Sequence, residues 1–256
     1  MANEIVLNLG TFLLDGSHDI AIEQINVKVA KTLSKADLPK AHGSVIPIAL
    51  RKEITAKIRG TVIGSDYDDL RSNLDDIKSA LEKTSEQKLT MDDDRYLMVQ
   101  YQDFDYSYKT LRRFAEFSFG LVASNPFWLS QALVTDTRSP QSGVGYVIAN
   151  NGNAPPRIRV TIKNNTGASL VDAIKLQNTT RGETFQYRGT LASGKSLVVN
   201  NRMDADDFIV ANDGTNDIKN FEGDFLMLSP GNNTIVFISS GAPNVEVKLE
   251  YRDTYL

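Results

Sequence analysis

The sequence predicts a mainly β protein of two domains, the first of which carries one helix and a long hairpin. Short stretches of alternating apolar and polar residues recur along the chain, separated by Gly or Asn. Only one segment has the three- and four-residue apolar spacing of an amphipathic helix. Residues 131–143 are polar and rich in turn formers. We therefore expect domains at 1–135 and 136–256.

The first elements predict a hairpin. Residues 20–30 alternate between apolar and polar side chains, with a slip near Gln24 that predicts a β-bulge. Residues 51–64 alternate again, and the connection between the two strands is polar, with the sequence KADLPKAHGSVIP at its tip. Two strands that flank such a connection predict a large hairpin over residues 25–60.

The amphipathic helix is expected over residues 65–83. Ser65 is a suitable N-cap, and Asp68 stands where the acidic partner of a capping box is found. A helix with this pattern needs an apolar surface to lie on, which a sheet of the same domain provides. Its predicted apolar face consists of Tyr67, Leu70, Leu74, Ile77 and Leu81.

The remainder of the chain predicts strands. An aromatic run closes the first domain at Phe127 and Trp128, the only Trp of the chain. Short strands at roughly ten-residue spacing then follow, which is typical of a β-sandwich or barrel. These strands are expected at residues 145–149, 158–162, 173–176, 183–187, 196–200, 207–210, 224–228, 233–238 and 245–251.

Composition excludes several classes of function. The chain has 256 residues, 41% of them hydrophobic and 23% charged, with a formal net charge of -4. Neither half is basic, so a large phosphate-binding surface is not expected. There is no cysteine, which excludes disulfides and thiolate sites. No signal peptide or membrane-length apolar run is visible, so we expect folding in the cytoplasm.

No segment predicts a catalytic, metal or cofactor site. His18 and His42 lie outside any nucleophile or metal motif, so both are interpreted as surface or interface residues. Asp92–Asp94 is interpreted as a solvated hairpin tip and not a cation site. Asn212–Gly214 resembles part of a calcium loop, but Asp-Gly between apolar runs favours a turn.

Aromatic residues offer an alternative, sugar-binding interpretation. Phe127, Trp128, Tyr187 and Tyr251 are the candidates for stacking on sugar rings. We favour a different role for Phe127 and Trp128, as aromatic residues at the domain junction. Glycosylation sequons carry little meaning without a secretion signal. They begin at Asn164, Asn178 and Asn232.

Four segments in order carry a resemblance to a known family. They are RGTVIGSDYDDLRSNLDDIKSAL, FSFGLVASNPFWL, NNGNAPPRIRVTI, and the stretch from YRGTLASGKSLVVNN to FEGDFLMLSPGNNTIVF. The last resembles a G-x-L-x-x-G-x-x-L and F-x-x-L-x-P-G-x-N-x-I signature. Each motif is weak by itself, but their order and spacing over nearly the whole chain resemble the siphophage distal tail proteins.

The resemblance implies a structural role. Residues 1–135 would form a β-sandwich-like ring domain with one helix and a long hairpin, and residues 136–256 a galectin-like β-sandwich. Members assemble into a homohexameric ring that joins the tail tube to the tail-tip hub, and often to receptor-binding parts. The expected location is the virion tail tip, after assembly in the host bacterial cytoplasm.

The same resemblance gives candidate contacts and partners. The partners would be further copies of the chain, the tail-tube protein, the hub protein and a receptor-binding protein, with DNA passing through the lumen without specific binding. No enzyme activity, cofactor or membrane contact is expected. The subunit-interface candidates at the hairpin tip are Leu38, Pro39, Lys40, His42, Gly43 and Val45.

Three other functions stay open from the sequence. A carbohydrate-binding, lectin-like tail protein would bind glycans through the second domain. A cell-wall hydrolase would depend on a carboxylate pair, which no sequence spacing identifies. Another ring protein of the tail, such as a tube or hub subunit, would not need the second sandwich.

Overall fold

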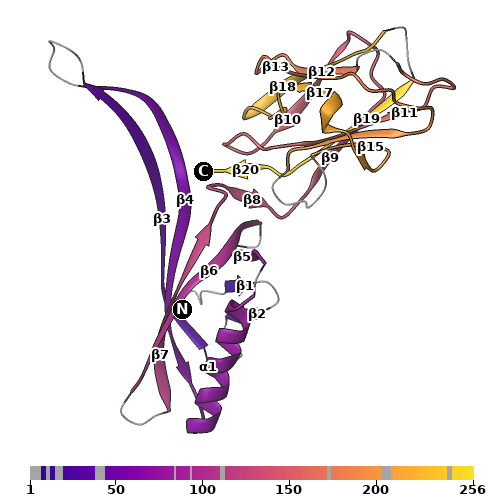
Figure 1. The fold of residues 1–256 in the computed structure, drawn as a ribbon. Coiled ribbons are helices and arrows are strands. Elements are labelled where there is room, and N and C mark those ends of the chain that lie inside the picture. The colour runs from indigo at the N-terminus through magenta and orange to yellow at the C-terminus, as the bar shows by residue number, and fades with distance from the viewer. Residues whose placement is uncertain are drawn as a thin grey trace. The chain divides into compact units, whose positions relative to one another are not determined.

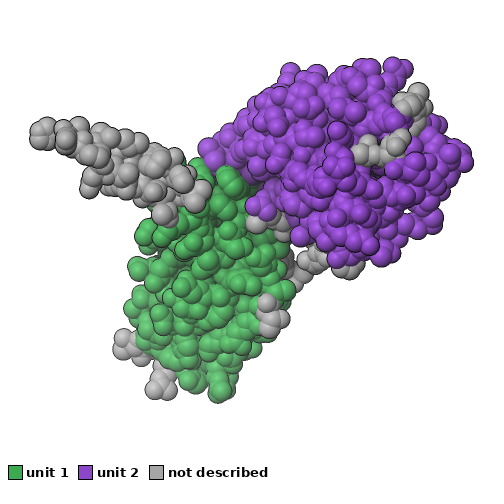
Figure 2. All heavy atoms as spheres, turned by 45° about the horizontal axis from the view of Figure 1, so that its top comes forward, with its two compact units in different colours: residues 1–128 green, residues 129–256 purple. Residues whose placement is uncertain are grey.

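Two compact units make up the chain, residues 1–128 and residues 129–256, which Figure 2 colours separately. Antiparallel strands dominate both units, so the predicted mainly β class is confirmed. Each unit has an apolar core of its own. The expected boundary after residue 135 lies inside the second unit. The computed structural model describes residues 7–9, 12–14, 20–37, 44–83, 85–92, 94–109, 113–171, 174–202, 209–240 and 244–256.

The described residues of unit 1 (residues 1–128) form strands β1 to β7 and helix α1, shown in Figure 1. The strands follow the order β2-β1-β5-β6-β7-β4-β3. The first residues of strand β6 pair with β5, and its later residues pair with β7. The bounds are Leu7–Leu9 for β1, Phe12–Leu14 for β2, Ile20–Asp37 for β3, Ser44–Ile63 for β4, Gln87–Asp92 for β5, Arg95–Tyr108 for β6 and Phe114–Ala123 for β7.

Strands β3 and β4 form the predicted long hairpin. The register shifts between Ile22 and Gln24, so the predicted bulge is confirmed. Strand β7 pairs with β4 only along Ile54–Ile63. In the described residues the hairpin beyond Ile54 is therefore a two-stranded ribbon, which Figure 1 shows curving away from the other strands of unit 1.

Helix α1 runs from Tyr67 to Leu81 and starts later than expected. Its N-cap is Asp66, whose side chain accepts a hydrogen bond of 3.0 Å from the Asp69 N–H. The predicted cap at Ser65 with Asp68 is therefore wrong. Asp66 holds the extended backbone that a cap requires, and the Ser65 N–H instead donates to Asp69 at 2.7 Å. Hydrogen bonds from the backbone and the side chain of Ser65 favour the charged Asp69 carboxylate and lower the pKa of Asp69.

The apolar face of α1 covers the unit 1 core, with one correction. Tyr67, which the spacing placed on this face, is 39% exposed. It is the first residue of the helix, and its ring lies against Tyr108 at the end of β6, with 5.6 Å between the ring centroids. The buried residues of the helix are Leu70, Leu74, Ile77, Ala80 and Leu81.

Unit 2 (residues 129–256) contains two antiparallel sheets that enclose a shared core. One sheet has the order β10-β18-β12-β13-β17, with bounds Gly145–Asn150, Gly231–Ile238, Ile174–Asn178, Glu183–Tyr187 and Phe221–Gly223. The other has the order β16-β15-β14-β11-β19-β9, with bounds Thr215–Asn216, Val210–Asn212, Ser196–Asn200, Arg159–Asn164, Val245–Tyr251 and Val134–Arg138. The remaining elements are β8 Trp128–Ser130, β20 Thr254–Tyr255 and the 3₁₀ turn Ile218–Asn220.

One predicted strand is wrong. Residues 224–228 do not form a strand, and Met227 makes only an isolated bridge with Arg157. The strand lies earlier, at Phe221–Gly223, and ends where Gly223 adopts a φ of 98° that other residues disfavour. Within the described part of the chain, no helix is long and apolar enough to cross a membrane.

Candidate subunit interface

Strand β3 forms one edge of the unit 1 sheet, because it is the last strand of the path. An edge strand presents backbone N–H and C=O groups that can pair with another chain. Two apolar side chains are exposed along it, Val27 at 37% and Val29 at 45%. Their cross-strand partners on β4, Ala56 and Ile54, are fully buried on the same face. The core of unit 1 thus reaches the surface at this edge.

A row of tyrosines lies along β6, at the opposite side from β3 of the four paired strands β6-β7-β4-β3. Strand β5 pairs with β6 only as far as Val99, so it does not cover β6 beyond that residue. There Tyr106 and Tyr108 are 41% and 38% exposed, with ring centroids 5.5 Å apart. Tyr67 extends the row at 5.6 Å from Tyr108. Lys78 of α1 lies over the Tyr106 ring at 4.5 Å, so the row faces the helix.

The opposite face of these strands is exposed to solvent, and its basic and acidic residues lie on different strands. Lys28 on β3 and Lys57 and Arg59 on β4 are basic, whereas Asp103 and Asp105 on β6 are acidic. Two shallow hollows lie on this face, and each is lined by residues from both groups of strands. Apart from Glu23 of β3, which lines one of the hollows, this face is basic toward β3 and acidic toward β6.

Most of the predicted hairpin-tip residues lie outside the described part of the chain. This applies to Leu38, Pro39, Lys40, His42 and Gly43. Val45 belongs to β4, where it pairs with Ala36 of β3. The assignment of these residues to a subunit interface stays a prediction. The sequence reasoning missed Val27, Val29 and the tyrosine row, because exposure depends on which strands are neighbours.

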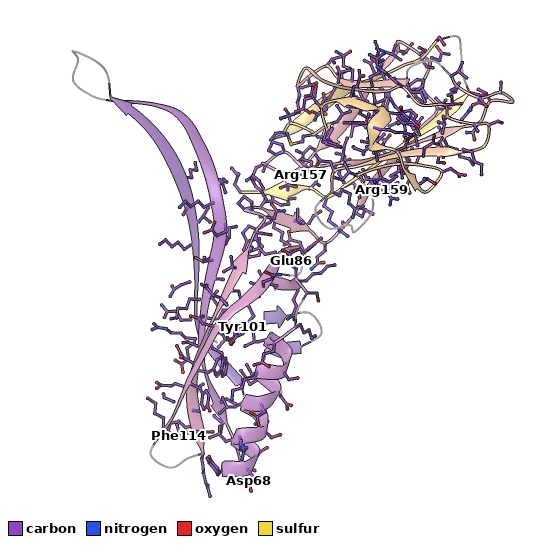
Figure 3. All side chains as sticks on the ribbon, in the orientation of Figure 1. Asp68, Glu86, Tyr101, Phe114, Arg157 and Arg159 are labelled. Atoms are coloured by element: carbon purple, nitrogen blue, oxygen red, sulfur yellow. The ribbon has the colours of Figure 1, made fainter. Side chains whose placement is uncertain are left out.

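The two predicted junction aromatics both belong to unit 1. Phe127 lies under the guanidinium of Arg51, which is 5.7 Å from the ring centroid. Trp128 packs half-buried against the unit 1 core. Figure 3 draws the described side chains on the ribbon and labels Tyr101 and Glu86 of unit 1. Arg51 belongs to β4, so Phe127 contacts the hairpin near its base.

The candidates for chemistry form no site in the described residues. No group of three or more His, Cys, Asp or Glu side chains there could hold a metal ion. His18 and Asp93 lie outside the described residues, as does His42, and Asp94 pairs with Arg95 at 3.6 Å. Asp213 has a φ of 49° beside Gly214 and pairs with Lys195 at 2.7 Å. That geometry confirms the turn interpretation of Asn212–Gly214.

Two of the sugar-stacking candidates are wrong. Tyr187 and Tyr251 are 0% and 2% exposed, so neither ring can stack on a sugar. Both point into the unit 2 core, since inward and outward positions alternate along a strand. Their hydroxyls donate to Asp217 and to the Ala149 carbonyl, each at 2.5 Å.

Comparison with known proteins finds a family model that matches part of the sequence and solved structures with a similar fold. Residues 151–255 match the family model described as siphovirus-type tail component, C-terminal domain. No curated protein sequence matches the chain. Among solved structures, the Dit protein of phage SPP1 matches with a TM-score of 0.75 at 13% identity, covering 98% of this chain and 99% of that one. It is described as a paradigm of the hub adsorption apparatus in phages that infect Gram-positive bacteria.

A second structure, from the baseplate of phage P2 in its activated conformation with calcium, matches with a TM-score of 0.50 at 10% identity and covers 98% of both chains. These likenesses extend over both units, whereas the family model covers the second. The resemblance found in the sequence is confirmed: residues 151–255 match the model of the siphovirus-type tail component C-terminal domain, and the whole chain has the fold of the siphophage Dit protein.

Proposed function

We propose that the protein is a structural subunit of a phage tail tip that forms a hexameric ring between the tail tube and the tail-tip hub. The ring domain would be unit 1, and unit 2 would be a galectin-like sandwich at its periphery. The partners would be the tube protein, the hub protein and a receptor-binding protein. The chain would assemble in the host cytoplasm and act without enzymatic chemistry.

The observation that carries this proposal is the pair of apolar rims on unit 1. Val27 and Val29 are exposed at one side of the strands, and Tyr106 and Tyr108 at the other. A closed cyclic ring needs heterologous contacts, in which one surface of a subunit fits a different surface of its neighbour. Neighbouring apolar side chains that are exposed together at an edge are typical of interaction sites.

Burial of the tyrosines in unit 2 weighs against the lectin-like alternative. Tyr187 and Tyr251 are held in the core by hydrogen bonds, so the second unit lacks these rings at its surface. Aromatic rings at the surface are the usual platform for sugar stacking.

The test is the mass in solution, by light scattering on a sizing column over a concentration series, with negative-stain images of each peak. We expect a particle of six copies of 28.3 kDa with a central hole. A monomer at every concentration would contradict self-assembly and would favour the carbohydrate-binding alternative. A glycan array would then decide, since a lectin must give hits.

A further inference from the structure

Strand β10 is the sheet edge of unit 2 that the described residues leave unprotected. The two sheets of this unit end at β10, β17, β16 and β9. We propose that the β10 edge binds an extended, uncharged segment of a different protein chain, which adds to the sheet as a further strand. The inference rests on the proposed role as a tail-tip subunit and names where each copy would hold a partner chain.

The other three edges have features that prevent pairing. Edge strands of soluble proteins are commonly protected by shortness, by charged side chains or by an irregular backbone. Strand β16 has only two residues. Strand β17 has three and ends at Gly223, and its Glu222 pairs with Arg188 at 2.8 Å. Strand β9 carries Asp136 and Arg138, whose side chains pair at 2.9 Å.

Strand β10 has none of these features. It runs over six residues, Gly145–Asn150, in unbroken register with β18, and it includes no Pro and no charged residue. Among the described residues, only β18 forms backbone hydrogen bonds with it (Figure 1), and the Tyr251 hydroxyl donates to the Ala149 carbonyl. The backbone of residues 145–148 can therefore pair with another strand on the side away from β18.

The surface beside this edge is apolar and uncharged. Val147 is 55% exposed, and Val144, directly before the strand, is 53% exposed. On β18, Val236 lies opposite Gly145, which has no side chain to cover it, and Ile238 is 37% exposed. No residue of β10 or β18 is charged. A strand added beside β10 would place its side chains against this apolar strip and remove part of it from water.

The other sheet of unit 2 has a very different outer face. There β19 carries Glu246, Lys248 and Glu250, at the positions that alternate with its buried apolar residues. Glu250 pairs with Lys248 at 2.9 Å and with Arg159 of β11 at 3.9 Å. One sheet thus presents ion pairs to solvent, whereas the other presents exposed apolar side chains beside an open edge. Such a patch is typical of an interaction site.

The absence of charge decides the kind of partner. A charged side chain placed against Val147 would lose water without gaining an opposite charge. Strand addition takes its affinity from backbone hydrogen bonds and its specificity from alternate side chains. The segment should therefore be extended and uncharged, with β-branched residues beside Val147. A second copy of this chain fits less well, because β10 against β10 is a symmetric two-fold contact, which cannot link neighbours in the proposed cyclic ring.

Hydrogen exchange with a peptide probe tests the assignment. The probe is a peptide of alternating Thr and Val, with Lys residues behind a Gly spacer at one end for solubility. Added to the full-length protein, it should slow the exchange of backbone amides in residues 145–148, measured by mass spectrometry. The same peptide with methylated backbone amides is the control, because it cannot complete the strand pairing.

Two variants with similarly exposed side chains separate this edge from the rest of unit 2. Val147→Lys places a charge at the edge and should weaken peptide binding at least about tenfold, which corresponds to ~1.4 kcal/mol. Ile209→Lys, at a 54% exposed position before β15 of the other sheet, is the matched control and should leave binding unchanged. Circular dichroism of both variants must show the unmodified strand content.

The outcomes separate the inference from the proposed function. Protection of residues 145–148 that Val147→Lys removes and Ile209→Lys keeps would support the inference. No protection, protection elsewhere, or full binding by Val147→Lys would overturn it. A smaller mass of Val147→Lys in sedimentation would also overturn it, since β10 would then pair with another copy. Negative-stain images of the same samples test the ring: rings without peptide binding would contradict only the inference, and peptide binding without rings only the ring.

Discussion

Buried asparagine side chains form hydrogen bonds with the turns that follow three strands of unit 2. Asn150, Asn164 and Asn178 are the last residues of β10, β11 and β12, and all three are buried. Each side-chain oxygen accepts a hydrogen bond from the backbone N–H two residues later, at 2.9, 2.9 and 3.1 Å. Their amide groups donate to carbonyls of other segments. Two of the sequons are thus explained by turn chemistry, because Ser and Thr favour the same turns.

The Tyr187 hydroxyl is the centre of a polar cluster at the edge of the unit 2 core. It donates to Asp217 at 2.5 Å and accepts from Asn212 at 2.7 Å. We predict that Tyr187→Phe lowers the free energy of unfolding of unit 2 by roughly 1–2 kcal/mol, because both partners lose a buried bond. Calorimetric unfolding measures the change in the transition of unit 2.

Tyr146 provides the matched control for that substitution. Its hydroxyl is buried without a hydrogen-bond partner among the described residues. Removing an unpaired buried hydroxyl removes a desolvation penalty, so Tyr146→Phe should leave unit 2 as stable or more stable. Equal losses of stability in the two variants would show that the hydrogen bonds of Tyr187 are not the cause of its effect.

Alkaline pH should destabilise unit 2 through two buried tyrosines, Tyr187 and Tyr251. Burial, with the hydrogen bond to Asp217 as a smaller cause, raises the pKa of Tyr187 to about 12, and burial raises the pKa of Tyr251 to about 12. The unfolded chain releases these protons near pH 10, whereas the folded unit retains them. The free energy of unfolding is therefore unaffected below pH 10 and falls as the pH rises toward 12.

The measurement is the urea midpoint from about pH 8 to about pH 11. Tyr187→Phe should make the decline shallower, because one of the titrating groups is gone. A midpoint that rises over this range would contradict the assignment of the raised pKa values.

At the scale of elements, helix α1 buries the apolar face from Leu70 to Leu81 that its spacing predicts. Leu74 is 1% exposed and sits at the centre of the apolar face. We predict that Leu74→Asp unfolds unit 1, since an unpaired carboxylate in the core costs several kcal/mol. Leu74→Ala should cost about 2–5 kcal/mol. Ser72→Ala, at an exposed helix position, is the control.

The readout is thermal unfolding by calorimetry, where the two units should give separate transitions. All members of one buried cluster lie within residues 1–128 and all members of the other within 129–256. Leu74→Asp should remove one transition and keep the other. Loss of both would mean that the units do not fold independently.

The strands of unit 1 show how register decides what is exposed. Val27 and Val29 lie in the same alternating run as Ile20, which is 2% exposed. The run predicts one apolar face, and the structure agrees. Only the position of β3 at the end of the sheet leaves the last two members uncovered, because no further strand or helix of the described residues lies over them.

At the scale of the whole molecule, the predicted interface residues at the hairpin tip are expected to act in assembly. We expect that replacing Leu38–Ile46 by an Asn-Gly turn leaves a folded chain that does not close the ring. The turn type suits a two-residue hairpin connection, so the strands can still pair. Light scattering and negative-stain images measure the result. Normal ring formation would show that the hairpin tip is dispensable and that other surfaces of unit 1 hold the ring.

The sequence by itself determined the β class, the hairpin with its bulge, the helix and the turn at Asn212–Gly214. These features depend on local periodicity and turn chemistry, which neighbouring residues encode. The errors were equally local. The N-cap is Asp66 and not Ser65, and the strand predicted at 224–228 lies earlier and ends at Gly223.

Only the tertiary structure decided which side chains are available for contact. Tyr187 and Trp128 are both aromatic residues at the end of a strand, yet the first is completely buried in unit 2 and the second is half-buried in unit 1. Val27 and Ile20 have the same pattern in the sequence but opposite exposure. Exposure is set by which strands and helices become neighbours, and those pairings join residues far apart in the chain. Alternation predicts that a face is apolar, and strand order decides whether that face is core or interface.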